Sequence, residues 1–97
     1  FLLSGRSEDM KFDTIEWLQS VALVPDWDGL YMRREGDFRD DAIVKRELYF
    51  QLIKDLKRDK YIEPLKEGII IFDDRQKVVD MWRSLGLTCC QVAQGNF

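Results

Sequence analysis

Two short polar segments directly follow apolar runs that have the composition of buried strands. The first, Ser4-Gly5-Arg6, comes after residues 1–3. A hydroxyl, a glycine that lets backbone N–H groups approach a ligand, and a guanidinium fork together suit the binding of a phosphate. An ordinary surface loop is the alternative, because Ser-Gly is a common loop dipeptide and a loop arginine is usually solvated.

The second segment, Asp73-Asp74-Arg75, follows the apolar run 68–72. Mg²⁺ takes oxygen ligands and is commonly held by one or two carboxylates together with substrate phosphate. Asp73 and Asp74 are therefore candidate metal ligands. The alternative is that Asp74 caps the following helix, a position at which aspartate is favoured.

Lys45 is the third candidate, in the first turns of a predicted helix. It follows Arg33, Arg34 and Arg39 along the chain. Considered alone, such a lysine is most simply a solvated residue on a helix face. Together with the two polar segments it would add positive charge to a phosphate site.

The composition excludes several classes of chemistry and of protein. The 97 residues are 45% hydrophobic, carry a formal net charge of -3 and include no histidine. This length allows one domain at most, and the apolar runs are shorter than the roughly 20 residues that a membrane span needs. Without imidazole, any catalysis must use carboxylates, lysine and arginine. The acidic balance disfavours broad electrostatic binding of nucleic acid, but it permits a local basic pocket.

Cys89 and Cys90 are the only cysteines. Because they are adjacent, they cannot staple separate segments together, so we expect a reducing compartment. The simplest interpretation is a pair of small buried residues in a strand, pointing to opposite faces.

The spacing of apolar residues predicts the elements that must position these groups. Phe12, Ile15, Leu18 and Ala22 recur at helical spacing and predict an amphipathic helix that begins near Ser7 and ends at Pro25. The further predicted elements are a strand at 29–33, a helix at 41–58, a strand at 68–72, a helix ending at 85 and a strand at 87–92.

Alternation of strands and helices predicts an α/β fold with a doubly wound parallel sheet. The run 68–72 shows no polar alternation, which is typical of a parallel strand covered on both faces. In such sheets the ligand lies beyond the carboxyl ends of the strands, where the polar segments fall.

Taken in order, the polar segments resemble motifs two, three and four of the haloacid-dehalogenase (HAD) superfamily of phosphohydrolases. The nearest resemblance is to the 3'-phosphatase domain of phage-type polynucleotide kinases. That domain carries stretches similar to residues 33–45, 73–83 and 87–97, so the resemblance covers nearly the whole chain.

The resemblance implies a role for each matching residue. Ser4 would hydrogen-bond the transferring phosphoryl group, Lys45 would neutralise it, and Asp73 and Asp74 would hold Mg²⁺. The residues that would bind substrate phosphate are Gly5, Arg6, Arg33 and Arg75. The implied substrate is a 3'-phosphorylated polynucleotide or nucleotide, and the implied location is the cytoplasm, that of the host if the protein is encoded by a phage.

The family's first motif, Asp-x-Asp-Gly-Thr, supplies the nucleophilic aspartate and does not occur among the 97 residues. Residues 26–29 imitate its spacing, but they precede a strand, so we interpret them as a turn. We therefore expect residues 1–97 to be the C-terminal part of a HAD-like phosphatase domain, incomplete at its N-terminus and inactive by itself.

The strand that carries the first motif would lie in the centre of the sheet, between residues 1–3 and 68–72. Upstream residues, a partner chain or assembly with further copies of the chain would each fill that gap, and we favour upstream residues. Two smaller departures are Asn96, where the family usually has an acid, and residues 57–67, which resemble a surface insertion.

Two functions follow as hypotheses. The first is a Mg²⁺-dependent phosphatase that processes nucleic-acid ends. The alternative is a catalytically inactive HAD-derived module for binding or assembly. The absent first motif favours the alternative, whereas the presence of Ser4, Lys45, Asp73 and Asp74 at strand ends disfavours it.

Overall fold

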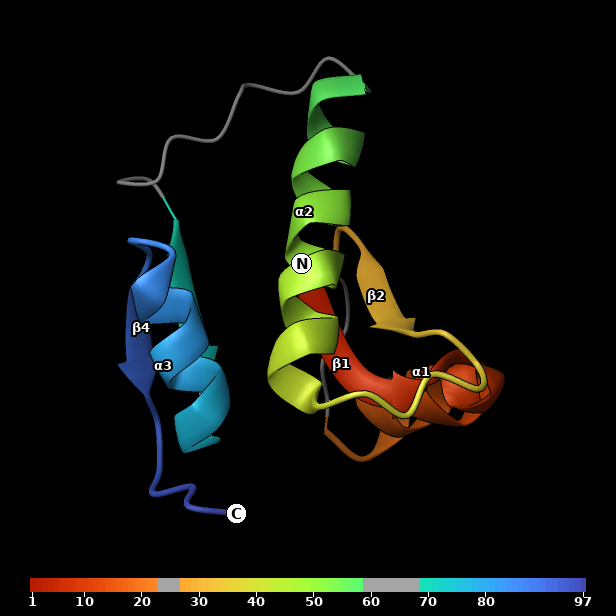
Figure 1. Ribbon diagram of the computed structural model, residues 1–97. Coiled ribbons are helices and arrows are strands. Elements are labelled where there is room, and N and C mark those ends of the chain that lie inside the picture. The colour runs from red at the N-terminus through yellow and green to blue at the C-terminus, as the bar shows by residue number, and fades with distance from the viewer. Residues whose placement is uncertain (23–26, 59–68) are drawn as a thin grey trace.

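Strands and helices alternate along the chain in the computed structural model, which describes residues 1–22, 27–58 and 69–97 (Figure 1). In chain order the elements are β1 (Leu2–Ser7), a 3₁₀ turn η1 (Glu8–Met10), α1 (Lys11–Ser20), β2 (Leu30–Arg33), α2 (Asp41–Arg58), β3 (Ile70–Asp73), α3 (Gln76–Ser84) and β4 (Thr88–Gln91). The alternation agrees with the predicted α/β class. Every helix in these ranges falls short of the length and apolar character that a membrane crossing requires.

The four strands form two separate parallel pairs. β1 pairs with β2, with Leu2 opposite Leu30, and β3 pairs with β4, with Ile71 opposite Cys89. The sequence predicts one doubly wound sheet, and the described strands form two sheets of two strands instead. The two pairs stay separate because no described strand lies between them to continue the hydrogen-bond ladder.

Helix α2 stands between the two sheets (Figure 1). It packs against β1 and β2 on one side and against α3 on the other. Its bounds, 41–58, are those predicted from its spacing of apolar residues, and Val44, Tyr49 and Leu52 are its buried side chains. The helix therefore contributes its apolar residues to both halves of the molecule, that is, to the half around β1 and β2 and to the half formed by β3, α3 and β4.

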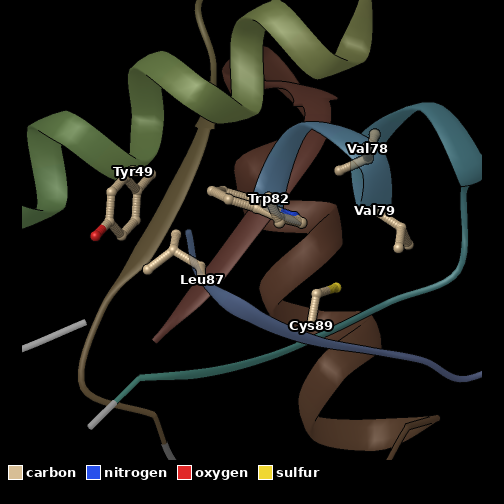
Figure 2. Packing of buried hydrophobic residues seen from close by; sticks show 6 residues of the cluster. All are labelled: Tyr49, Val78, Val79, Trp82, Leu87 and Cys89. Carbon is tan, nitrogen blue, oxygen red and sulfur yellow. The ribbon is translucent and has the colours of Figure 1, made fainter. Parts of the chain in front are cut away.

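The most deeply buried side chains lie between α3 and the β3–β4 sheet (Figure 2). Val78, Val79 and Trp82 of α3 are almost fully inaccessible to solvent. Tyr49 of α2 meets the Trp82 ring edge to face, with ring centroids 5.6 Å apart. This geometry suits the aromatic quadrupoles and joins α2 to the core.

Strand β1 is longer than predicted. It runs to Ser7, so Ser4, Gly5 and Arg6 lie within the strand and not in a loop after it. The pairing register shifts between Ser4 and Ser7, which marks a bulge. At the bulge the Arg6 N–H bonds to the Ser4 hydroxyl at 3.1 Å, and this local bond takes the place of a ladder partner.

The amphipathic face predicted for the first helix is wrong for two of its four apolar residues, because Phe12 and Ala22 are exposed, whereas Ile15 and Leu18 are half-buried. Within η1 and α1 only Thr14 is buried, and Phe12 is 89% exposed. An apolar stripe is buried only where another element covers it, and the described residues provide no such cover for Phe12. Pro25, predicted to end this helix, lies outside the described residues, as does Asp26 of the predicted turn at 26–29.

The prediction that the strand at 68–72, which is β3 in the structure, is covered on both faces is also wrong. Ile70 and Phe72 are 60% and 68% exposed, whereas Ile71 packs on the core. Helix α3 covers one face of this sheet, and within the described part of the chain no element covers the other. Gly68 lies outside the described residues.

The two cysteines differ in environment. Both are free thiols, with Cys89 buried in the core and Cys90 exposed, so the expectation that both are buried holds for Cys89 alone. Alternation along β4 places them on opposite faces, and burial raises the pKa of the Cys89 thiol.

Candidate functional site

An open cleft of about 350 Å³ lies where β1, β2 and β3 approach the N-terminal turns of α2. The residues that line it are Gly5, Arg6, Arg33, Asp41, Lys45, Asp73, Asp74, Arg75 and Phe97. The cleft therefore brings together every site residue predicted from the sequence except Ser4. It also contains two residues that the sequence analysis did not select, Asp41 and Phe97.

The Lys45 ammonium and the Asp73 carboxylate form an ion pair at the centre of the cleft. Lys45 Nζ lies 2.9 Å from Asp73 Oδ2, and the two side chains are 14% and 9% exposed. The Trp82 indole N–H donates to the same oxygen at 3.3 Å, and the Asp74 backbone N–H donates to Oδ1 at 2.9 Å. Both oxygens of Asp73 are thus engaged by donors from α2, α3 and the following residue.

These donors control the charge of Asp73. Burial acts to raise the pKa of this carboxyl, but the hydrogen bond and positive charge of Lys45 oppose that effect. Smaller contributions come from Trp82 and from the Asp74 N–H, and together the donors hold the pKa below its ordinary value. Asp73 is therefore a carboxylate at neutral pH and fixes the position of Lys45.

A single carboxylate, Asp41, faces three cations. Its Oδ1 lies 3.3 Å from Arg33 Nη2, and its Oδ2 lies 3.9 Å from Lys45 Nζ and 3.8 Å from Arg75 Nη1. The cations come from β2, α2 and the start of α3, so Asp41 joins both halves of the molecule. In the sequence, the only feature that could have pointed to Asp41 is its position one helical turn before Lys45.

Arg33 is the most constrained cation of the cleft. Its Nε donates to the Gly5 carbonyl at 2.7 Å, and its Nη1 donates to the carbonyls of Asp37 and Arg39 at 3.1 and 2.6 Å. A Cβ at position 5 would overlap the Asp41 carboxylate, so any larger residue there would displace that side chain from its place beside Arg33. The bulge in β1, the loop after β2 and the start of α2 are therefore tied together by one guanidinium.

Ser4 and Arg6 contribute differently from the prediction. Ser4 is absent from the cleft lining, and its hydroxyl accepts the Arg6 N–H at 3.1 Å within β1. The Arg6 side chain lines the cleft, and among the described residues no partner engages its guanidinium. Arg6 is thus available to an anionic ligand, whereas Ser4 shapes the strand that presents it.

Asp74 is the carboxylate that remains open. The start of α3 is capped at Arg75, so Asp74 does not take the helix-cap position that was the alternative for it. No hydrogen bond or ion pair to the described residues engages its side chain, which is exposed. Of the two acids, Asp74 is the one free to bind a cation.

Asp74 is placed to bind a Mg²⁺ ion whose remaining ligands come from water and substrate phosphate. The described residues contain no group of three side chains that would enclose a metal. Mg²⁺ does not need such a cage, because it commonly uses one or two carboxylates and completes its octahedron with water and substrate phosphate. Asp74 would hold the ion, and Asp73 lies next to it.

Arg75 and Phe97 form a stacked pair at the side of the cleft. The guanidinium carbon lies 4.7 Å from the ring centroid, within the range of a cation–π contact. Phe97 was predicted only as part of the similar stretch at 87–97. Its place in the cleft depends on how the segment after β4 returns to α3, and no local pattern in the sequence reveals this.

Comparison with known proteins gives results for both the family and the fold. The family described as "Polynucleotide kinase PNKP phosphatase domain" matches residues 1–97. A chain in the structure of the Pnkp1/Rnl/Hen1 RNA repair complex is similar, with 39% identity and a TM-score of 0.77 over 99% of this sequence. A chain of a second Pnkp1/Rnl/Hen1 complex structure gives 36% identity and a TM-score of 0.75, also over 99%. The sequence spans 28% and 30% of those two chains.

Proposed function

This chain belongs to the family of polynucleotide kinase PNKP phosphatase domains, and from that premise we propose that it is the C-terminal part of a phosphatase domain that removes phosphate from the 3' end of a polynucleotide. The proposal includes Mg²⁺ as cofactor. The similar chains belong to RNA repair complexes, which favours an RNA end as the substrate over a free nucleotide.

The convergence of charge in the cleft carries this proposal. Arg33, Lys45 and Arg75 come from three elements and meet around Asp41, and Arg6 lines the same cleft. A phosphoryl group presents several negatively charged oxygens, which this arrangement of cations matches. A purely structural network has no need of an unengaged arginine and an unengaged aspartate in the same hollow.

Each residue then has a distinct task. Lys45, held by Asp73, would neutralise the charge of the transferring group. Arg6, Arg33 and Arg75 would bind its oxygens. A Mg²⁺ ion at Asp74 would add positive charge to the same oxygens. The nucleophilic aspartate of this family belongs to the Asp-x-Asp-Gly-Thr motif, which does not occur among the 97 residues, so another segment would supply it.

The same segment would complete the sheet. We propose that a strand between β1 and β3 joins the two parallel pairs into the doubly wound sheet of HAD-like proteins. The parallel direction of both pairs supports this, as does the meeting of β1, β2 and β3 at one cleft. Upstream residues are the favoured source of the strand, and a partner chain or a further copy of the chain is the alternative.

The test measures Mg²⁺-dependent phosphate release from 3'-phosphorylated RNA and DNA oligonucleotides by the full natural protein. We expect release to fall by at least about 100-fold in Lys45→Met, because charge stabilisation in the transition state is lost. Asp74→Asn should weaken activation by Mg²⁺. The matched control is Lys54→Met, on the exposed side of the same helix and outside the cleft, which should keep full activity.

The alternative, a module for binding or assembly, makes a different prediction. Such a protein would bind a 3'-phosphorylated oligonucleotide through the cleft and release no phosphate at any Mg²⁺ concentration. Binding that Lys45→Met abolishes, without turnover in the wild type, would therefore replace the phosphatase proposal with the binding module. If Lys45→Met releases phosphate as fast as the wild type, both the catalytic role and the binding role of the cleft are contradicted.

A further inference from the structure

Phe97 presents an aromatic face beside the cationic cleft. Its side chain lines the cleft and is 63% exposed, although the Arg75 guanidinium covers part of the ring. A planar group stacked on the free part of the ring would remove apolar surface from water, which is favourable. The ring also lines the same cleft as the cations that bind phosphate in the proposed function.

A second hollow, of about 460 Å³, lies beside this stacked pair. It is lined by Gln76, Gln91, Val92, Ala93, Gln94, Gly95 and Asn96. Four of these residues carry a carboxamide and none carries a charge, in contrast to the residues that line the cationic cleft. Gln76 and Asn96 directly neighbour Arg75 and Phe97 in the sequence, so the two hollows adjoin.

The carboxamides offer both donors and acceptors to a ligand. No hydrogen bond from the described residues occupies the side chains of Gln94 and Asn96. Carboxamides pair with the edges of nucleobases, which likewise present donors and acceptors side by side. A phosphate would use only the N–H donors of such a lining, because it offers acceptors only.

The segment that forms this hollow is held in place before any ligand arrives. The Gln76 N–H donates to the Gly95 carbonyl at 2.7 Å, and the Gln91 side chain donates to the Asp74 carbonyl and to Gln76 Oε1, both at 3.0 Å. A Cβ at Gly95 would overlap the Asp74 backbone, so this close approach requires glycine. Such preorganisation lowers the entropic cost of binding.

We propose that Phe97 stacks against the base of the terminal nucleotide, whose edge bonds to the carboxamide hollow while its 3'-phosphate occupies the cationic cleft. This inference rests on the proposed function for the phosphate. It adds a subsite for the nucleoside, with an aromatic platform and an amide-lined wall. Stacking on an aromatic ring tolerates any base, and the carboxamides provide the means to distinguish between bases.

The experiment compares two 3'-phosphorylated oligonucleotides that differ only in the terminal nucleotide. One carries a normal base, and the other carries a tetrahydrofuran abasic analogue. For the full natural protein we expect kcat/KM to be about 5- to 150-fold higher with the base present, the range expected of one base–aromatic stack. Phe97→Ala should lose this preference, and Phe97→Trp should keep it.

Matched controls separate stacking from other effects. Phe38→Ala removes a phenylalanine that is 94% exposed and lies outside both hollows, and it should leave the preference unchanged. Inorganic phosphate, which carries no base, should inhibit the wild type and Phe97→Ala equally. A loss of phosphate inhibition in Phe97→Ala as large as the loss of kcat/KM would show that Phe97 acts through Arg75, and would overturn the proposal.

Failure of the subsite and failure of the proposed function give different results. A base preference that persists in Phe97→Ala, or equal activity of the wild type on both oligonucleotides, overturns the subsite and leaves the phosphatase intact. If neither oligonucleotide releases phosphate, the proposed function fails. Equilibrium binding of the same two oligonucleotides then tests the stack directly, with the same expected ratio and the same variants.

Discussion

The two halves of this molecule are stabilised by different interactions. The β3–β4 sheet and α3 enclose the most deeply buried side chains, with Val78 and Val79 at 0% exposure and Trp82 at 2%. At about 25 cal/mol per Å² of apolar surface, such burial is the main favourable contribution to folding. This half is therefore a small hydrophobic core that α2 completes with Tyr49.

The β1–β2 half relies more on polar contacts with α2. The Tyr31 hydroxyl donates to Asp55 at 2.8 Å, Arg33 pairs with Asp41 at 3.3 Å, and Arg39 pairs with Glu47 at 2.6 Å. Met32 and Val44 are buried here, but they are not members of the main core cluster. This half is attached to α2 through charge and hydrogen bonds as well as through these apolar side chains.

The cleft lies between the halves, and this position explains its chemistry. The β3–β4 half provides Asp73, Asp74 and Arg75, and the β1–β2 half provides Gly5, Arg6 and Arg33. Asp41 and Lys45 of α2 connect the two sets. Because the connection is electrostatic, the charge of a ligand in the cleft acts directly on the contacts that join the halves. Three variants test this contrast.

The largest loss of stability should follow from Trp82→Ala. Removal of this ring leaves a cavity in the core and costs about 3–5 kcal/mol of unfolding free energy. Phe12→Ala, in the other half, removes an aromatic side chain that is 89% exposed and should change stability by less than about 0.5 kcal/mol. Chemical denaturation measures both. Equal losses would mean that the hydrophobic core does not dominate the stability.

A smaller, pH-dependent loss should follow from Lys45→Met. At pH 7 this change leaves the Asp73 carboxylate without its cation and costs about 2–3 kcal/mol. In the wild type the lowered pKa of Asp73 stabilises the fold above its ordinary pKa, and this contribution is lost as the pH falls through the lowered value. In the variant, Lys45 no longer opposes the effect of burial on the pKa of Asp73. Asp73 therefore takes up a proton at higher pH, which removes its unpaired charge.

The difference in unfolding free energy between wild type and Lys45→Met should therefore shrink as the pH falls from 7 to about 3. Denaturation at a series of pH values measures it. Lys54→Met, outside the cleft, should show a small difference that does not vary with pH. If the difference in unfolding free energy for Lys45→Met does not vary with pH, Lys45 does not control the ionisation of Asp73.

The smallest effect on stability should follow from Arg39→Gln, in the loop after β2. Hydrogen bonds from the Arg39 side chain and backbone lower the pKa of Asp37 to about 2. Without the guanidinium, we expect this pKa to rise toward its ordinary value near 4, measured by an NMR titration. Exposed ion pairs contribute little to stability and are screened by salt, so the melting temperature should change least of the three variants.

Asp55 provides the internal control for that titration. Its pKa is lowered mainly by the Tyr31 hydroxyl, with smaller contributions from Gln51 and nearby cations. Arg39 takes no part in this, so the titration of Asp55 should be the same in both proteins. An unchanged pKa of Asp37 in the variant would show that Arg39 does not fasten the loop after β2.

Several features of the fold and the site follow from local patterns alone. Helix α2 has its predicted bounds because apolar residues recur at helical spacing over five turns. Helix α3 and strand β4 also lie where they were predicted. Asp73 and Asp74 were selected because an acidic pair after an apolar strand suits Mg²⁺, and Arg33 and Lys45 received their roles from the resemblance to the family motifs. The family model also matches all 97 residues.

Other features depend on which distant segments meet, and a local pattern cannot report this. The exposure of Phe12 and Phe72 depends on cover from other elements. The bulge that places Ser4 outside the cleft depends on pairing with β2. Asp41 and Phe97 joined the site only when the tertiary structure brought Arg75 beside them. The sequence by itself thus determined the order of elements and the kinds of chemical group, because these follow from residue type and spacing. The tertiary structure decided which groups share a site, because burial and charge pairing arise between residues far apart in the chain.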